Sequence, residues 1–197
     1  MIKTTSMLLA ETQAYKNPTA KIQQLVRNKS LFPVVKGIYE TNGNTPGYYL
    51  ANAIYGPSYL SFEFALAFHE LIPETVYAYT SATCEKKRRK KYITAFGTFT
   101  YRDVPVKAFP YEKTIYQEEG YSYIVANPEK AICDFLYAQA PCANRNELKQ
   151  LLFEQTRMEY QAFQSLDKTK LLELATLYGT RNHKLLIAWV RRLMGDE

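Results

Sequence analysis

The chain has 197 residues, of which 47% are hydrophobic, and it carries a formal net charge of +6 at pH 7 with a pI near 9.1. Its three cysteines have no CxxC spacing, and no apolar run approaches the roughly 18–20 residues that cross a bilayer. We therefore expect a reduced, soluble, cytoplasmic protein with no membrane partner. The positive charge favours an anionic partner, either a nucleic acid or an acidic protein surface.

The first forty residues have the pattern of two helices followed by a short hairpin. Residues 2–11 and 18–29 are predicted helices, and Asn17 is placed to cap the second one, with Pro18 at its first position. Residues 31–34 and 37–40 are predicted strands. Two helices followed by a hairpin are typical of a compact winged helix-turn-helix module.

A polar segment rich in turn-forming residues, 41–47, follows this module. It is the predicted boundary between two domains. We expect a winged helix-turn-helix DNA-binding domain at residues 1–45 and a mixed α/β domain at residues 46–197.

The rest of the chain mixes helical and strand patterns, so the expected fold class is α+β, with helices at the C-terminal end. The predicted helices are residues 61–71, 127–138, 144–154, 167–179 and 181–194. The predicted strands are residues 75–83, 91–96, 98–102, 104–109 and 121–126. Ser58 or Ser61 is expected to cap the first of these helices.

The outward face of the predicted helix at 18–29 carries side chains that can read base edges. Arginine pairs with guanine, and asparagine or glutamine with adenine, while flanking lysines can contact phosphates and fix the register. The candidate DNA-binding residues are Lys16, Asn17, Lys21, Gln24, Arg27, Asn28, Lys29 and Lys36. The alternative interpretation is an ordinary solvated helix face.

A second concentration of positive charge follows Glu85 and lies between two predicted strands. Its members are Lys86, Lys87, Arg88, Arg89, Lys90 and Lys91. If the flanking strands pair, the run forms a protruding basic loop that attracts phosphates and binds them with steep salt dependence. The alternative is a flexible, solubilising loop, and the anion could be DNA, RNA or an acidic protein face.

The two histidines do not suggest a metal site. His69 lies in an aromatic helix, where a half-buried structural role is expected, and His183 falls in the first turn of the last helix. Neither has a neighbouring histidine or cysteine at the spacing that a metal site needs.

Catalytic patterns are also missing from the sequence. It has no phosphate-binding glycine-rich motif and no GxSxG motif. Cys133 is expected in the core, and helix-start charge or solvation accounts for the carboxylates of Glu129, Asp134, Glu118 and Glu119. We therefore predict a protein that is not an enzyme and that needs neither cofactor nor metal.

Four segments together resemble the AbiEi family of bacterial type IV antitoxins. They are 53–74 (AIYGPSYLSFEFALAFHELIPE), 79–83 (YTSAT), 96–101 (FGTFTY) and 127–137 (NPEKAICDFLY). In that family an N-terminal winged helix binds inverted repeats in the operon's own promoter, and a C-terminal α/β domain carries the antitoxic activity. The cognate toxin, AbiEii, has a nucleotidyltransferase fold, and the pair acts in phage defence by abortive infection.

The resemblance assigns roles to particular segments of this chain. It matches residues 17–27 to the recognition helix and residues 31–39 to the wing, with Lys36 and Gly37 at the usual basic-glycine pair. The basic run at 86–91 lies where the family often has basic residues, which implies a continuous basic face. The family's module has three helices ahead of the wing, whereas about sixteen residues precede Asn17, so a shortened module is expected.

Three functional hypotheses follow. The first is a DNA-binding transcriptional autorepressor and antitoxin that counteracts an AbiEii-type toxin. The second is a protein-interaction module that neutralises the toxin directly, without specific DNA binding. The third, an enzyme that modifies the toxin or an RNA, requires nucleotide binding, for which the sequence has no motif.

Overall fold

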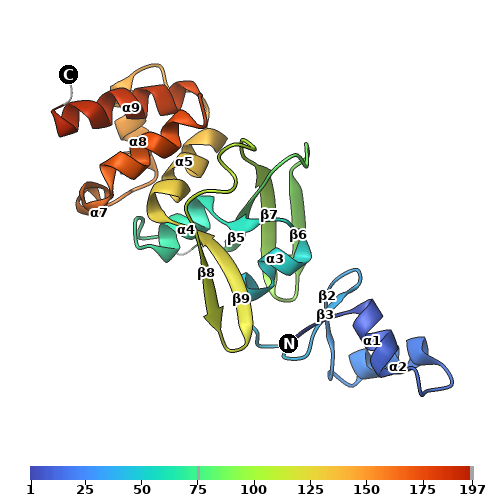
Figure 1. Ribbon diagram of the computed structural model, residues 1–197. Coiled ribbons are helices and arrows are strands. Elements are labelled where there is room, and N and C mark those ends of the chain that lie inside the picture. The colour runs from blue at the N-terminus through green and yellow to red at the C-terminus, as the bar shows by residue number, and fades with distance from the viewer. Residues whose placement is uncertain (75, 196–197) are drawn as a thin grey trace.

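The computed structural model describes residues 1–74 and 76–195, and it is an α+β fold with two sheets, as expected at that level. A small sheet and two helices lie at one end of the molecule, a larger sheet lies in the middle, and the C-terminal helices lie at the other end (Figure 1). Within the described ranges, no helix is both long enough and apolar enough to cross a membrane.

The N-terminal unit, residues 1–40, contains two helices and a three-stranded antiparallel sheet in the order β1-β3-β2. Its elements are β1 (Ile2–Thr4), α1 (Thr5–Glu11), α2 (Pro18–Arg27), β2 (Phe32–Val35) and β3 (Ile38–Glu40). The second helix and the hairpin are confirmed, with α2 ending two residues earlier than expected.

The predicted helix at 2–11 is wrong in its first three residues. Ile2, Lys3 and Thr4 form β1, which pairs with Glu40, Tyr39 and Ile38 of β3. The helix begins at Thr5 because the Thr4 hydroxyl accepts a hydrogen bond from the Met7 N–H at 3.3 Å. Strand pairing with a segment 34 or more residues away cannot be read from local periodicity.

The small sheet is apolar on both of its faces. On one side, Tyr39 of β3 packs against a small buried cluster of Leu8, Ile22 and Leu31. On the other, Val34 belongs to the main core of the protein, and Phe32 and Ile38 pack against it. The N-terminal unit is therefore attached to the body through one face of its sheet.

The central sheet is mixed, in the order β6-β7-β5-β4-β9-β8. Its strands are β4 (Tyr59–Leu60), β5 (Ala78–Thr83), β6 (Lys90–Thr94), β7 (Gly97–Asp103), β8 (Lys113–Glu118) and β9 (Tyr121–Ala126). β5 runs parallel to β7, and β4 runs parallel to β9. The helical elements of this part are a 3₁₀ turn η1 (Gly47–Leu50), α3 (Ala51–Ile54) and α4 (Phe62–Phe68).

The C-terminal helices pack on the sheet through α5, which contacts α4 on one side and α8 and α9 on the other. Their bounds are α5 (Pro128–Ala138), α6 (Arg145–Lys149), the π-helical turn η2 (Gln150–Gln155), α7 (Tyr160–Ser165), α8 (Lys168–Thr176) and α9 (Arg181–Met194). The predicted helices at 127–138, 167–179 and 181–194 are confirmed within three residues at each end. The helix predicted at 144–154 is α6 continued by η2.

Several strand predictions need correction. The strand predicted at 104–109 is a turn, in which the N–H groups of Ala108 and Phe109 donate to the Pro105 carbonyl. Proline lacks an N–H for a strand ladder and favours such turns. β8 and the two-residue β4 were not predicted, and the strand predicted at 75–83 is observed from Ala78, with residue 75 outside the described ranges. α4 is also shorter than the predicted helix at 61–71.

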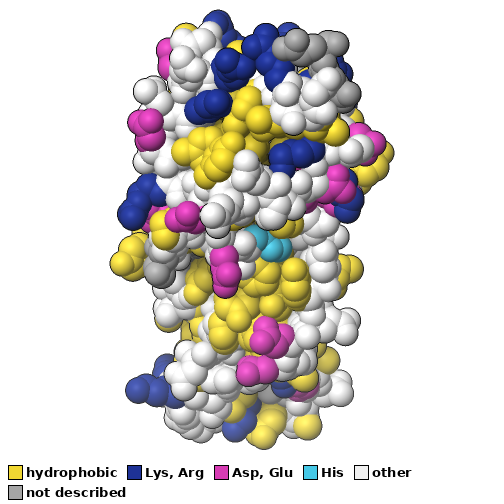
Figure 2. Space-filling view, turned by 90° about the vertical axis from the view of Figure 1, so that its left-hand side faces the viewer, with side chains coloured by type: hydrophobic (Ala, Val, Ile, Leu, Met, Phe, Trp, Pro, Cys, Tyr) yellow, Lys and Arg dark blue, Asp and Glu magenta, His cyan; other side chains and the backbone are white. Residues whose placement is uncertain are grey.

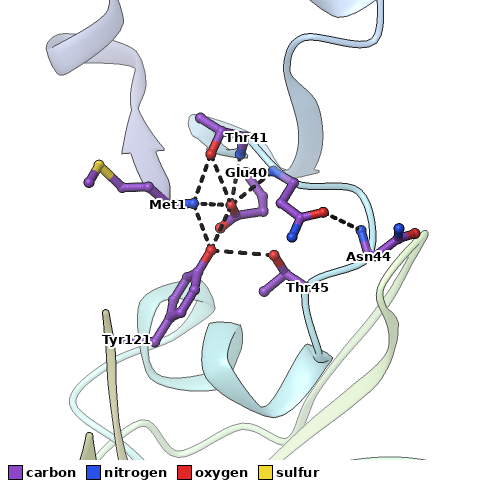
Figure 3. Close-up of polar contacts among 7 residues, drawn as sticks. Met1, Glu40, Thr41, Asn44, Thr45 and Tyr121 are labelled. Atoms are coloured by element: carbon purple, nitrogen blue, oxygen red, sulfur yellow. Dashed lines mark hydrogen bonds and ion pairs between the residues drawn. The ribbon is translucent and has the colours of Figure 1, made fainter. Parts of the chain in front are cut away.

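A polar cluster joins the N-terminal unit to the central sheet (Figure 3). The Met1 ammonium and the Tyr121 hydroxyl both donate to the Glu40 carboxylate, the latter at 2.8 Å, and Met1 also donates to the Tyr121 oxygen at 2.6 Å. Burial alone would raise the pKa of Glu40, but these hydrogen bonds and the Asn42 N–H lower it overall. The carboxylate is thus held in its charged form between the two parts of the protein.

The same junction has no room for a side chain at position 47. A Cβ on Gly47 would lie 2.4 Å from the Phe96 carbonyl oxygen and close to the Tyr79 ring. Phe96 lies in the turn between β6 and β7, so Gly47 lets η1 approach that turn directly.

We predict that Gly47→Ala lowers the free energy of unfolding by about 1–3 kcal/mol, because a backbone carbonyl has to move to admit the methyl group. Urea denaturation of both proteins measures the difference. Ser122→Ala, at an exposed position of β9, is the control and should leave the midpoint unchanged. Equal stability of Gly47→Ala and the wild type would contradict the close packing described here.

Candidate nucleic-acid interface

Helix α2 begins as the sequence predicted. The Asn17 side-chain oxygen accepts the Ala20 N–H at 3.0 Å, and Pro18 occupies the first position of the helix. Ile22 is buried against Leu8 and Leu31, which turns the opposite side of the helix to solvent. Because its oxygen caps the helix, Asn17 cannot pair through both amide atoms with an adenine unless that cap opens.

The exposed side of α2 carries most of the candidate base-reading residues. Gln24, Arg27 and Asn28 are exposed, and so are the flanking Lys16 and Lys29. Lys21 is only half-exposed, because its ammonium lies 4.8 Å from the centre of the Tyr15 ring and 3.3 Å from the Gln24 side-chain oxygen. These contacts hold Lys21 and Gln24 on the surface of the helix.

A cleft of about 440 Å³ separates α2 from the hairpin. Arg27 and Val26 line it from the helix, and Lys36 and Pro33 line it from β2 and the turn. Gly37 at the tip of the hairpin has a φ of +87°, a conformation that favours glycine. The structure therefore brings Arg27 and Lys36, two of the candidate residues, to the same cleft.

The basic run at 86–91 is anchored at one end and exposed at the other. Asp103 fixes it by accepting the Lys87 N–H and the Thr83 hydroxyl, both at 2.6 Å. Lys86 donates to the Gly56 carbonyl at 3.1 Å and lies 5.2 Å from the centre of the Tyr55 ring. Lys87, Arg88, Arg89, Lys90 and Lys91 are all exposed, the last two on β6.

The strands that flank this run do not pair with each other, so the condition for a protruding loop between paired strands is not met. β5 and β6 both pair with β7, which lies between them. The connection from β5 to β6 therefore crosses the end of β7. There, Lys87, Arg88 and Arg89 line a pocket of about 280 Å³ together with Arg102 and Tyr137.

The two basic surfaces are separated by the length of β6. The basic run precedes β6, while the turn that follows β6 contains Phe96, whose carbonyl meets Gly47 at the junction with the N-terminal unit. Figure 1 shows the β5–β6 connection at the end of the sheet away from β2 and β3. The structure thus does not bring Lys86–Lys91 next to the exposed side of α2.

A buried polar network that was not predicted is centred on Lys130 and Asp134 of α5. The two side chains are fully buried, with 3.5 Å between the ammonium and the carboxylate. Asp134 accepts hydrogen bonds from the hydroxyls of Tyr59, Ser61 and Tyr178, at 2.9, 2.6 and 2.5 Å. The expectation that solvation accounts for Asp134 is therefore wrong, because its carboxylate is buried and paired. The expected side-chain cap by Ser61 is also absent, since the Ser61 hydroxyl donates to Asp134 instead.

The ammonium of Lys130 also donates to the Ala108 carbonyl and to the Tyr178 oxygen, each at 2.6 Å. Burial lowers the pKa of Lys130, and the neighbouring Asp134 partly opposes this. Burial likewise raises the pKa of Tyr59 and Tyr178. Since every group is buried and paired, the network offers no position for a substrate. In the sequence, the signal for this network is a lysine and an aspartate four residues apart among apolar neighbours.

The histidines behave as structural residues. His69 is half-buried, as expected, and one ring nitrogen lies 2.7 Å from the Ala126 carbonyl. His183 is fully buried and stacks on Tyr178, with Nε2 3.0 Å from the Cys133 carbonyl and Nδ1 2.6 Å from the Thr180 hydroxyl. Among residues 1–74 and 76–195, no three His, Cys, Asp or Glu side chains gather as a metal site would require.

No known family profile matches the chain, and no curated protein matches its sequence. The likeness to AbiEi antitoxins stays a prediction based on the four segments quoted above.

We predict that protonation of His183 destabilises the protein in mild acid. Burial lowers its pKa from 6.5 to about 4, so between these values the unfolded chain binds a proton that the folded chain does not. The stability present above pH 6.5 should fall by up to about 3 kcal/mol as the pH drops to 4. Urea denaturation over this pH range measures the slope.

His183→Gln separates this effect from the carboxylates that titrate in the same range. The variant is expected to be less stable at neutral pH and to lose less stability than the wild type between pH 6.5 and 4. Parallel pH profiles for the two proteins would exclude His183 as the source.

Proposed function

We propose that this chain is a DNA-binding transcriptional autoregulator whose N-terminal unit is a shortened winged helix-turn-helix. The observation that carries the proposal is the element order β1-α1-α2-β2-β3 with the sheet order β1-β3-β2. In a helix-turn-helix the second helix enters the major groove, and here that helix is α2. A strand ahead of the two helices and a hairpin after them are the further parts of a winged module.

The side chains suit such a role. Gln24, Arg27 and Asn28 would face base edges, and Lys16, Lys29 and Lys36 would contact phosphates on either side. Asn17 contributes the helix cap, and Lys21 holds Gln24 on the outward surface. The positive end of the α2 dipole, at its N-terminus, would favour a phosphate nearby.

The basic run at 86–91 would contact the same nucleic acid at a distance. It is separated from α2 by the length of β6, so a single duplex would have to extend along the molecule to reach both. Counterion release from exposed lysines and arginines supplies affinity without sequence preference. In this arrangement α2 provides specificity and the loop provides additional affinity.

We further propose an antitoxin role against a nucleotidyltransferase-fold toxin, on the basis of the family resemblance. The polar network of α5 lies within one of the resembling segments, 127–137, and Tyr59 and Ser61 lie within another, 53–74. The resembling residues thus include those that hold α5 to the sheet. This supports a scaffold shared with the AbiEi family. Contact with a toxin is tested by the co-expression experiment below.

Arg27→Glu is predicted to weaken binding to the chain's own upstream DNA by about 10- to 100-fold. Fluorescence anisotropy with that duplex and a scrambled duplex measures the change. Arg145→Glu, an exposed position on α6 with the same change of charge, is the matched control and should bind like the wild type. Equal affinities of the two variants, with unchanged melting temperatures, would rule out α2 as the recognition helix.

The same variant separates the two parts of the proposal. Co-expressed with the product of the adjacent gene, the Arg27→Glu chain should still rescue growth if antitoxicity does not depend on DNA binding. Loss of rescue together with loss of DNA binding would mean that the antitoxic effect acts through transcription.

Replacing Lys87, Arg88 and Arg89 together by Gln is predicted to reduce the salt dependence of DNA binding. Each lost phosphate contact lowers the slope of log K against log salt by about 0.9, so the total decrease reaches about 3. The preference for the native duplex should be retained. A control with Lys107, Arg145 and Lys184 replaced by Gln removes the same charge from other exposed positions. Identical slopes for the two triple variants would argue against a role of the loop.

A further inference from the structure

An apolar groove of about 670 Å³ lies between α4 and the segment that follows it. Phe64 and Phe68 of α4 form one wall, and Ile72 and Val76 form the other. Phe68 is 37% exposed, which is high for a phenylalanine facing a groove of its own protein. Figure 2 shows hydrophobic side chains gathered in this part of the surface, with Asp and Glu at the edges.

The rim of this groove is acidic, although the chain as a whole is basic. Glu70, Glu74 and Glu159 line it. Glu74 pairs with Arg157 at 3.1 Å, whereas within the described ranges no cation lies at salt-bridge distance from Glu70 or Glu159. An occupant that suits this groove is therefore apolar in the middle and positively charged at its edges.

The end of α9 has that chemistry. Leu186, Trp189 and Val190 are buried, and the same helical stripe continues through Leu193 and Met194, which are 47% and 43% exposed. The helix thus carries its apolar stripe past the core that it covers.

Positive charge surrounds this second apolar surface. Arg191 and Arg192 are exposed beside Leu193. The 47% exposed Tyr160 of α7 extends it, since its ring packs on Phe153, which in turn packs on Trp189. In Figure 2 the hydrophobic side chains over the C-terminal helices have Lys and Arg around them.

Both surfaces face the same way, as the single view in Figure 2 shows. A twofold axis that lies in the plane of contact, between the two surfaces, turns a second copy to face the first, so that each surface meets its opposite and the contact occurs twice. We propose that the α4 groove receives the α9 end of a second copy of this chain, and that the protein is a symmetric dimer through this face. The two contacts pair apolar with apolar and acidic with basic surface, and the proposal does not depend on DNA binding.

Two charge-reversed variants test the pairing. Glu70→Lys with Glu159→Lys makes the groove basic, and Arg191→Glu with Arg192→Glu makes the α9 end acidic. Sedimentation velocity over a range of protein and salt concentrations measures the dissociation constant. The wild type should dimerise, and each variant alone should dissociate at least about tenfold more readily, because like charges then meet at both contacts.

An equimolar mixture of the two variants is the decisive sample. In a mixed dimer, the basic groove meets the acidic α9 end, and the unaltered groove meets the unaltered α9 end. Both contacts are then complementary, so the mixture should recover the dissociation constant of the wild type, which each variant alone loses.

Glu85→Lys with Glu173→Lys is the control for net charge, since neither residue lines the groove or lies on α9. It should dimerise like the wild type, and circular dichroism melting should show all variants folded. A wild type that is monomeric at every concentration would overturn the proposal. So would a dimer that neither charge reversal weakens, or a mixture of folded variants that stays monomeric.

Discussion

The buried ion pair between Lys130 and Asp134 is the interaction on which the body of the protein depends. Two charges in an apolar interior are stable only when each is paired and hydrogen-bonded. Here Asp134 receives the hydroxyls of Tyr59 and Ser61 near the start of α4, and that of Tyr178 after α8. The pair therefore fixes α5 against the sheet and the C-terminal helices at once, and removing either partner would leave the other charged and buried.

The N-terminal unit is attached by a second set of contacts. The face of its sheet that is turned to the body packs on the main core through Val34, and the Glu40 carboxylate accepts a hydrogen bond from the Tyr121 hydroxyl. Both contacts come from the small sheet, which leaves the helices α1 and α2 free of the body. A helix held away from the rest of the protein in this way can approach a duplex without a clash from the central sheet.

Local sequence signals predicted the helices better than the strands. Asn17 with Pro18, and Asp167 ahead of α8, are caps that act within one turn, and the structure has both. β1, β4 and β8 were missed because each is short or largely exposed, and because their partners lie elsewhere in the chain. Strand pairing, unlike helix capping, depends on residues that are far apart in the sequence.

The candidate site was predictable in part for the same reason. The exposed residues of α2 follow from helical periodicity, and so does their separation from the buried Ile22. The position of the basic run relative to α2 depends on β7 lying between β5 and β6, which no local pattern indicates. The hydroxyl partners of Asp134 come from residues more than forty positions away, so no local pattern around Asp134 identifies them.

The order of the central sheet leaves β6 and β8 at its two margins. An unpaired strand margin is a template for intermolecular β-pairing, and lysines along it are a common protection against aggregation. β6 begins with Lys90 and Lys91 and exposes Ile93, while β8 begins with Lys113 and exposes Ile115. Each margin thus places lysine next to one exposed isoleucine, and Lys90 and Lys91 protect theirs from self-association whether or not they meet an anion.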